Sequence, residues 1–424
     1  MNTRILFWLV PDNFTKKIFL KIRKKYPYSN RIDFKSKKDL ALNLLNYKNL
    51  FKSNNSKFFS SNLLKDIYNE NINEWLDNYY SRRMSMDLNI FTLREIFKKQ
   101  SEYILNYLTK HKFSHLIISA DSGIGIDFLT YKIAKKIGIK TIFLFGEHRN
   151  FFFYTYDKDD WGKFDFAKKK LNKLNKKNFN FEKIFNYRKP FYMNTEFLLA
   201  SNNSLKVFYK SFRSQLRRSS KENLNMKFFN KWVEQKKLVF LSKNLPKKYV
   251  YFSLNHQPES TTIAWGNGYI DQISAIEKLR RIIPRNIKII VKDHPAQLDL
   301  YHRDKFFNQR LKLIDNVLIS NCRDNTRLLI EKSICVALIY GKTGWEALQK
   351  KKPVISFGQN WYNNIHGVHT FNKNLNFNKI QNFKFNKKLF YSTIENLMTK
   401  TAPGIVYKSI QSNSVDFSTN FKKE

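Results

Sequence analysis

The chain has 424 residues, more than one ordinary hydrophobic core uses, and this length predicts two domains of roughly 200 residues each. Hydrophobic residues make up 42% of the sequence and aromatic residues 16%, which excludes a chain that is disordered throughout. The 77 Lys and Arg residues outnumber the 34 Asp and Glu residues and give a formal net charge of +43, but they are spread along the chain without a single basic arm, which argues against a nucleic-acid-binding protein.

The first half of the chain predicts a strand at 4–10 and a basic helix at about 13–24, followed by helical patterns over 39–110. The apolar run of the first strand has only about six residues, which favours a buried strand over a signal peptide. A β-α-β unit follows, with a strand at 115–120, a helix at 126–137 that Gly138 ends, and a strand at 140–145.

The second half alternates strands and helices. Its composition changes near residue 237, after a segment rich in Lys, Asn and Phe at 157–235. Strands are expected at 249–254, 287–292, 315–319, 334–339 and 353–357, and helices at 271–282, 325–332 and 344–350. Alternation at this spacing predicts a parallel sheet with crossover helices. One more helix is expected at 388–399.

The predicted fold class is therefore α/β, with two Rossmann-like domains. We expect an N-terminal domain with a helical insertion at 1–235, a second domain at 236–370, and a helical tail at 371–424 that packs back on the core. Doubly wound sheets bind ligands at the carboxyl ends of their strands. The cleft between two such sheets is the expected active site.

Polar loops follow three predicted strands of the second half and should leave the same edge of one sheet. They are residues 255–262, the run Lys292-Asp293-His294-Pro295, and residues 341–347. His294, held by Pro295, can donate to a leaving phosphate or carry a proton. An ordinary capped loop histidine is the alternative. Glu259 can act as a nucleophile, a base or an acid, or be a solvated carboxylate.

The third loop, Gly341-Lys342-Thr343-Gly344-Trp345-Glu346-Ala347, precedes a predicted helix. The free N–H groups at a helix start suit a phosphate, and Thr343 adds a hydroxyl. Glu346 can accept hydrogen bonds from ribose hydroxyls. The alternative is a glycine turn in which Thr343 caps the helix and Glu346 completes a capping box. The spacing of a Walker P-loop is absent.

In the first half, Asp121, Glu147 and His148 follow predicted strands. They are candidate bases for an acceptor hydroxyl, although loop capping explains each of them equally well. The acidic run Asp157-Lys158-Asp159-Asp160 lies away from the three loops and is interpreted as solvated.

Six stretches between about residues 245 and 370 keep a characteristic order and spacing. They are Tyr249–Leu254 with Gln257-Pro258-Glu259, Tyr269–Gln272, Val291–Pro295, Tyr340–Ala347, Lys352–Gly358 and Trp361-Tyr362. This pattern resembles the capsule polysaccharide biosynthesis family, which includes bacterial Kdo transferases of GT-B-like fold. The resemblance implies two Rossmann-like domains facing a central cleft, with the acceptor on the side of the first domain.

The resemblance also implies a CMP-activated donor, typically of a 2-keto acid sugar such as Kdo. His294, with Lys292 and Pro295 beside it, would contact the donor phosphate. Thr343 and Gly344, with Gly341, would hold the same phosphate at the helix start. Glu346 would bind the ribose, and Glu259 would be the catalytic carboxylate. The Kdo transferases carry an acidic pair in the first loop, whereas Ser260 follows Glu259 here.

The predicted function is a glycosyltransferase of capsular or lipopolysaccharide-type polysaccharide biosynthesis that transfers Kdo or a related sugar from CMP to a glycan or glycolipid. A CDP-glycerol-type polyol phosphotransferase and a sugar-nucleotide epimerase are the enzyme alternatives. A basic RNA- or membrane-binding protein is the alternative without catalysis. A helix start and an imidazole can stabilise the single phosphate of CMP without a metal, so we expect no metal or other cofactor.

The expected location is the cytoplasm, with a peripheral contact to the anionic inner face of the cytoplasmic membrane as a further expectation. Cys335 lies in an apolar run and is interpreted as a small core residue, and together with Cys322 it forms neither a disulfide framework nor a zinc motif. Much of the positive charge is explained by coding bias, because Lys, Asn, Phe, Ile and Tyr abound while glycine and proline are scarce.

Overall fold

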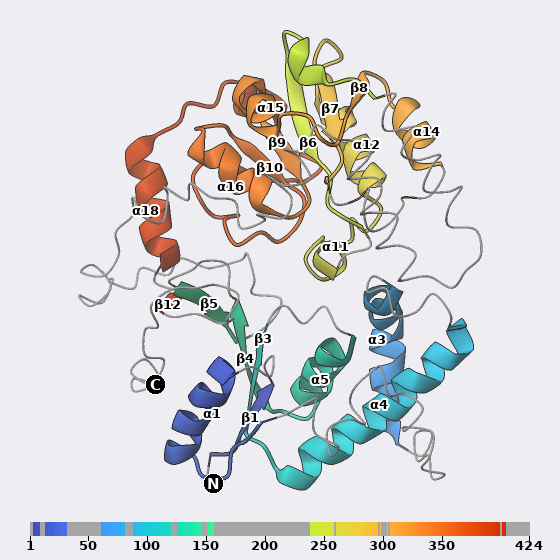
Figure 1. Cartoon of the computed structure of the whole chain (residues 1–424), viewed down its shortest axis with the longest axis vertical. Coiled ribbons are helices and arrows are strands. Elements are labelled where there is room, and N and C mark those ends of the chain that lie inside the picture. The colour runs from blue at the N-terminus through green and yellow to red at the C-terminus, as the bar shows by residue number, and fades with distance from the viewer. Residues whose placement is uncertain are drawn as a thin grey trace. The chain divides into compact units, whose positions relative to one another are not determined.

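The computed structural model describes residues 3–8, 13–31, 61–80, 88–119, 125–145, 151–156, 238–257, 260–295, 297, 303, 306–398 and 401–403. The chain divides into two compact units, Met1–Lys169 with Glu395–Glu424, and Lys170–Ile394. Each unit contains one six-stranded sheet with helices packed on it (Figure 1). The α/β fold class with two sheets is confirmed. The predicted domain boundary near residue 235 lies outside the described residues and stays a prediction.

The sheet of the first unit has the order β12-β5-β4-β3-β1-β2. Its strands are β1 (Ile5–Trp8), β2 (Asn30–Arg31), β3 (His115–Ser119), β4 (Lys140–Phe145), β5 (Phe151–Thr155) and β12 (Thr401–Pro403). The strands β2, β1, β3 and β4 are parallel, whereas β5 and β12 are each antiparallel to their neighbour. The strands expected at 4–10, 115–120 and 140–145 are confirmed as β1, β3 and β4.

Four described helices accompany this sheet. They are α1 (Asn13–Lys25), α3 (Asn62–Tyr80), α4 (Ile90–His111) and α5 (Gly125–Lys136). The last three pack against one another. Helix α4 begins where the side chain of Asn89 accepts a hydrogen bond from the Thr92 N–H, and it buries a stripe from Leu93 to Leu108 at helical spacing. Gly138 ends α5 with a positive φ of 79°, as the sequence predicts.

The buried stripe of α4 contains one polar residue whose side chain makes no hydrogen bond. Gln100 is fully buried, and neither atom of its amide has a hydrogen-bond partner. Because an unsatisfied buried amide costs about 1–3 kcal/mol, we expect Gln100→Met, which keeps the unbranched shape, to raise the free energy of unfolding by about 1 kcal/mol. Urea unfolding of the whole chain measures this change. Ser101→Ala is the control without a gain, since the Ser101 hydroxyl donates to the Phe97 carbonyl oxygen at 2.8 Å. A less stable Gln100→Met protein contradicts the prediction.

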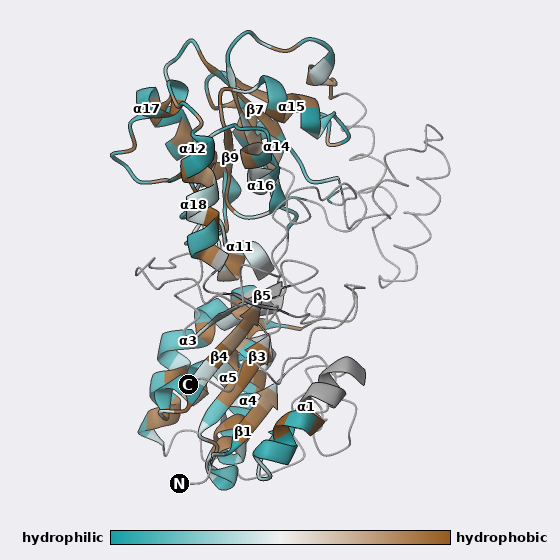
Figure 2. Cartoon of the chain, turned by 90° about the vertical axis from the view of Figure 1, so that its left-hand side faces the viewer, coloured by the Kyte–Doolittle hydropathy of each residue, from teal (hydrophilic) through white to brown (hydrophobic). Residues whose placement is uncertain are grey.

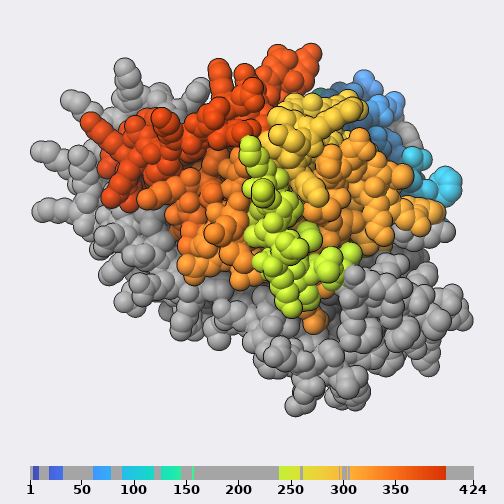
Figure 3. Space-filling model, turned by 90° about the horizontal axis from the view of Figure 1, so that it is seen from above, coloured from blue at the N-terminus to red at the C-terminus, as the bar shows by residue number. Residues whose placement is uncertain are grey.

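The sheet of the second unit has the order β11-β10-β9-β6-β7-β8, and all of its strand pairs are parallel. Its strands are β6 (Tyr249–Ser253), β7 (Lys288–Lys292), β8 (Val317–Ser320), β9 (Val336–Leu338), β10 (Val354–Ser356) and β11 (Val368–Thr370). Seen from above, the segment that leads into β6 (lime) lies between later parts of the same unit (Figure 3). The predicted parallel sheet is confirmed, and β11 is one strand more than expected.

The helices of the second unit are α11 (Ser260–Ala264), α12 (Gln272–Ile282), α14 (Phe307–Lys312), α15 (Thr326–Lys332), α16 (Lys342–Gln349), α17 (Phe377–Gln381) and α18 (Lys387–Met398), with a 3-10 turn η5 (Leu241–Lys243). The helices expected at 271–282, 325–332, 344–350 and 388–399 are confirmed as α12, α15, α16 and α18. No helix of the described residues is long and apolar enough to cross a membrane.

The two faces of the second sheet differ. One face buries an apolar core against α12, α14 and α17, and the strands are accordingly among the most hydrophobic parts of the unit (Figure 2). Cys335 belongs to this core, as expected. On the other face, the hydroxyl of Tyr249 donates to the Leu329 carbonyl of α15, and α16 packs on β9 and β10. The site described next lies where this second face reaches the carboxyl ends of the strands.

Candidate nucleotide-binding site

The three loops singled out in the sequence leave the same edge of the sheet. Strands β9, β6 and β7 are direct neighbours and run parallel, so the residues after Leu338, Ser253 and Lys292 emerge side by side. The prediction that the loops converge is confirmed. The polar side chains that hold them together are described first, because they fix where the candidate ligands lie.

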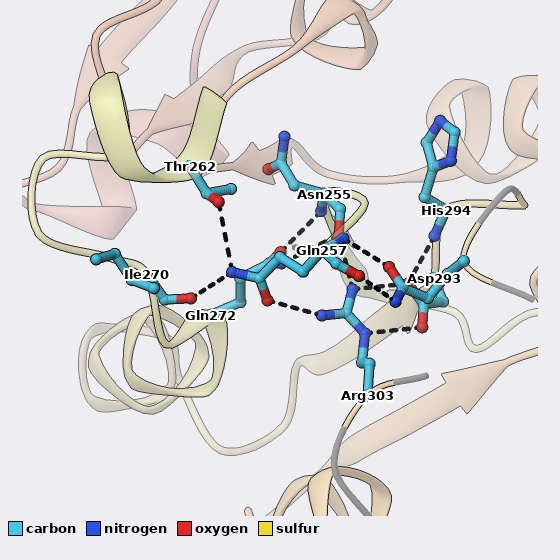
Figure 4. A network of polar contacts seen from close by, with 9 residues as sticks. Asn255, Gln257, Thr262, Ile270, Gln272, Asp293, His294 and Arg303 are labelled. Atoms are coloured by element: carbon cyan, nitrogen blue, oxygen red, sulfur yellow. Dashed lines mark hydrogen bonds and ion pairs between the residues drawn. The ribbon is translucent and has the colours of Figure 1, made fainter. Parts of the chain in front are cut away.

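Three amide side chains join these loops by pairing with the backbone as a peptide group does. Asn255 donates from Nδ2 to the Tyr340 carbonyl at 2.7 Å and accepts from the Tyr340 N–H at 3.3 Å. Gln272 makes the same pair of bonds with the backbone of Asn255, at 2.7 and 3.0 Å (Figure 4). Gln297 does so with the backbone of Gln257, at 2.6 and 2.5 Å. The loop after β6 is therefore tied to the loop after β9 and to α12.

Arg303 ties the loop after β6 to the loop after β7. Its guanidinium donates to both carboxylate oxygens of Asp293, from Nε at 2.8 Å and from Nη2 at 2.7 Å. It also donates to the Asn255 carbonyl at 2.7 Å and to Gln257 Oε1 at 3.0 Å (Figure 4). Only 7% of the Arg303 side chain and 16% of the Asp293 side chain are exposed. Asp293 thus holds the loop in place rather than facing a ligand.

His294 follows β7 by two residues, where the sequence predicts it. Its backbone N–H donates to Asp293 Oδ1 at 2.8 Å, and its ring is directed away from the Arg303 network (Figure 4). The ring centroid lies 5.8 Å from that of His256, in the loop after β6. Desolvation by burial lowers the pKa of His294, Lys292 and Arg303 lower it further, and Asp293 opposes them. The imidazole is therefore neutral near pH 7 in the free protein.

The glycine-rich loop starts α16 at Lys342, two residues earlier than expected. Gly341 is the N-cap residue, with a φ of 129° that favours glycine, and no side chain caps the helix. Thr343 therefore lies inside the first turn, and the alternative of a capping box between Thr343 and Glu346 is wrong. The first backbone N–H groups of a helix have no partner within it, so this turn offers N–H donors and the positive end of the helix dipole.

Gly344 leaves no room for a larger residue. A Cβ atom at this position would lie 2.9 Å from Cζ of Tyr362 and 3.0 Å from Cδ2 of Leu338. The hydroxyl of Tyr362 donates in turn to the Gly341 carbonyl. Tyr362 therefore holds the loop from behind, which gives a physical reason for both glycines in the motif.

Lys292 and Glu346 bring opposite charges to the same edge. Lys292 is only 4% exposed; burial lowers its pKa, and Cys322, Asp293, Asp324 and Glu346 act in the opposite direction. Glu346 is exposed to solvent, yet the protein that surrounds it raises its pKa, while Lys342 and Lys292 lower it. Its surface is accessible, so Glu346 can still meet a ligand, whereas Lys292 is buried at the end of β7.

Several predicted site residues lie outside the described residues. They are Glu259 with the preceding Pro258, the acceptor-side candidates Asp121, Glu147 and His148, and the acidic run at 157–160. Their roles stay predictions. The structure brings the predicted nucleotide ligands to one sheet edge, namely Lys292, His294, Pro295, Gly341, Thr343, Gly344 and Glu346. Within the described ranges, no group of three or more His, Cys, Asp or Glu residues could hold a metal ion.

Sequence reasoning missed Arg303, Ser253 and the role of the amides. His256 could have been noticed, because it stands in a loop already singled out. Arg303 lies in a polar stretch without periodicity, and nothing local marks it as the residue that joins two loops.

Residues 197–406 match the model of the family described as capsule polysaccharide biosynthesis protein. No curated protein matches the chain. Among solved structures, it is similar to the beta Kdo 2,7 transferase of Thermosulfurimonas dismutans KpsC, with 11% identity, a TM-score of 0.39, and coverage of 96% of this chain and 94% of that one.

Two further structures show a similarity of the same kind. The beta Kdo 2,4 transferase of Thermosulfurimonas dismutans KpsC has 11% identity and a TM-score of 0.33, covering 70% of this chain and 88% of that one. The UDP-GlcNAc 2-epimerase of Methanocaldococcus jannaschii has 13% identity and a TM-score of 0.29, covering 94% and 98%. All three loops lie inside the segment that the family model matches, and this segment, residues 197–406, belongs to the capsule polysaccharide biosynthesis protein family.

Proposed function

We propose that the protein is a glycosyltransferase of surface polysaccharide biosynthesis that transfers Kdo, or a related 2-keto acid sugar, from a CMP-linked donor to a glycan or glycolipid acceptor. The observation that carries the proposal is the first turn of α16. Its N–H groups and Thr343 lie at the same sheet edge as His294, inside the segment that belongs to the family. The choice of Kdo follows from the family resemblance of the motifs.

This site is suited to a leaving phosphate. When an acceptor hydroxyl attacks the anomeric carbon, its proton passes to a base, for which Asp121, Glu147 and His148 are the candidates. The bond from that carbon to the phosphate oxygen breaks, and CMP leaves with one additional negative charge. The N–H groups of α16 and the imidazole N–H of His294 can donate to that charge as it develops. Glu346, one turn after Thr343, is placed to accept hydrogen bonds from the ribose. Glu259 is the proposed catalytic carboxylate, and no metal or other cofactor enters the proposed reaction.

The proposal is tested by nucleotide binding to the whole chain. A ligand that binds the folded state raises the melting temperature by mass action, by an amount that corresponds to about 2.7 kcal/mol at a concentration 100 times its Kd. We expect CMP to raise the melting temperature more than UDP or GDP does. Incubation with CMP-Kdo and a surface glycolipid extract, followed by mass spectrometry of the lipid, then tests transfer.

The alternatives predict different results. A response to UDP without one to CMP would contradict the proposal and favour an epimerase or a UDP-sugar transferase. Binding of CMP together with transfer of a polyol phosphate from CDP-glycerol would favour the phosphotransferase. Binding of polyanions without any nucleotide would favour a protein that acts by binding alone.

A further inference from the structure

The last residue of each strand in the second sheet belongs to one row of neighbours. The row runs through Thr370, Ser356, Leu338, Ser253, Lys292 and Ser320, each paired with the next across the sheet. Residues that pair in this way point to the same face of the sheet. Five of the six are polar, whereas the strand residues before them are mostly apolar. The sheet therefore ends in a polar row directly beneath the proposed nucleotide site.

Ser253 connects this row to the first turn of α16. Its hydroxyl oxygen lies 3.2 Å from that of Thr343, and either atom can be the donor. Within the described part of the chain, Ser253 is the only hydrogen-bond partner of the Thr343 side chain. Two residues earlier on the same face, the Tyr251 hydroxyl lies within hydrogen-bonding reach of Ser253 and of Thr326. The hydroxyls of Tyr251, Ser253 and Thr343 thus form a chain from the interior to the helix start.

The direction of this chain matters, because each hydroxyl has one hydrogen to donate. If Thr343 donates to Ser253, it turns its lone pairs to the ligand and repels a phosphate. If Ser253 donates to Thr343, the hydrogen of Thr343 is left for the phosphate. A phosphate bound at the start of α16 selects the second arrangement, because its charged oxygens accept the hydrogen of Thr343 and Ser253 is then left to donate to the Thr343 oxygen.

The charge of Lys292 acts in the same sense. Lys292 is the cross-strand neighbour of Ser253 in the row and is almost fully buried. When Lys292 is protonated, its positive charge attracts the lone pairs of the Ser253 oxygen, which leaves the hydrogen of Ser253 for the side of Thr343. A bound phosphate and a protonated Lys292 therefore favour the same direction of donation.

We propose that Ser253 is a positioning residue, which donates to Thr343, so that the hydroxyl hydrogen of Thr343 points at the donor phosphate. The inference rests on the proposed function, because it takes the phosphate of CMP as the ligand of α16. It concerns the phosphate alone, and recognition of the nucleoside does not depend on it.

The experiment compares CMP with cytidine by calorimetry on the whole chain. In the wild type, the ratio of the two affinities reports the contribution of the phosphate. We expect Ser253→Ala to weaken CMP about tenfold, the scale of one hydrogen bond to a charged group, and to leave cytidine unchanged. Thr343→Val should have the same effect, and the double variant should be no weaker than Thr343→Val alone, because both act through one hydroxyl.

Two further variants separate positioning from stability. Ser253→Thr keeps the hydroxyl and should retain most of the CMP affinity. Ser320→Ala is the matched control: Ser320 is a serine of the same row on the other side of Lys292, but it donates to Asp324. It should leave the ratio of CMP to cytidine affinity unchanged even where it lowers the melting temperature.

Three results would overturn the inference while the proposed function stands. They are an unchanged CMP affinity of Ser253→Ala, an equal loss for CMP and cytidine, and a double variant whose loss is the product of the single losses. A wild-type protein that binds CMP no better than cytidine would overturn the proposed donor, and the inference with it.

Discussion

The Arg303→Met protein is expected to lose about 3 kcal/mol of its free energy of unfolding, the scale measured when one partner of a buried ion pair is removed. The side chain that is lost donates to Asp293, Gln257 and Asn255, and only 7% of it is exposed. Without it, the Asp293 carboxylate stays largely buried and retains the His294 N–H at 2.8 Å. Urea unfolding, analysed by linear extrapolation, measures the change.

A second substitution tests the physical reason. Asp293→Asn removes the charge that Arg303→Met leaves without its cation, so the double variant should be more stable than Arg303→Met alone by about 1–2 kcal/mol. Arg303→Lys should recover little, because a single ammonium cannot reach three acceptors on two loops. If Asp293→Asn destabilises the Arg303→Met protein further, the carboxylate is not the source of the loss.

The same fold offers a matched control on its surface. Arg310 donates to Asp271 at 2.6 Å, but these side chains are 43% and 48% exposed. Arg310→Met should therefore change the free energy of unfolding by less than about 1 kcal/mol, as for most exposed ion pairs. Equal losses at Arg303 and Arg310 would show that burial does not decide the effect.

The strands that form the candidate site could be predicted because each is a continuous apolar run between polar segments. In a parallel sheet covered on both faces, the interior residues of β6, β7 and β9 are apolar on both sides, so the polar loops that follow these strands stand out. The sequence of a single strand does not determine the order of the strands in the sheet. The alternation of strands with helices predicts a parallel sheet, and a parallel sheet places the three loops at one edge.

The structural features that the sequence does not predict depend on contacts between distant residues. Strand β5 is an aromatic run without alternation, and β12 has three residues that are ordered by pairing with β5. The sequence predicts a start of α16 two residues too late, because Gly341 and Gly344 are equally good local signals for a helix start. The positive φ of Gly341, with its carbonyl held by Tyr362, decides between them. The bonds of Asn255 and Arg303 cross 85 and 48 residues, and no local pattern marks such pairs.

His294→Gln is expected to lower the rate of CMP release from CMP-Kdo by about tenfold, which is less than the roughly 100-fold loss that follows complete removal of a donor to a developing charge. The glutamine amide keeps a hydrogen-bond donor, but it cannot gain the positive charge that an imidazole gains by protonation. Because the pKa of His294 is lowered in the free protein, the ring is neutral there near pH 7. A phosphate bound beside it favours the protonated ring and raises that pKa, so binding takes up a proton.

The sign of the pH dependence follows from this proton uptake. The affinity for CMP should rise as the pH falls through the pKa of the complex, and it should level off below the lowered pKa of the free protein. The stability of the free protein has the opposite trend. The unfolded chain binds a proton at the ordinary histidine pKa of 6.5 and the folded chain only below it, so stability is lost as the pH falls from 6.5 towards the lowered value.

Calorimetry from pH 8 to pH 5.5 separates His294 from the phosphate of CMP, which titrates in the same range. The ratio of wild-type to His294→Gln affinity cancels the titration of the ligand, and we expect this ratio to increase as the pH falls. His369→Gln is the control, because burial lowers the pKa of His369 as well, but it lies in β11 at the far edge of the sheet from β7. Its ratio should stay constant. If the His294→Gln ratio also stays constant across this range, the phosphate does not lie beside His294, and the loop after β7 serves the site by holding its shape through Asp293 and Arg303 alone.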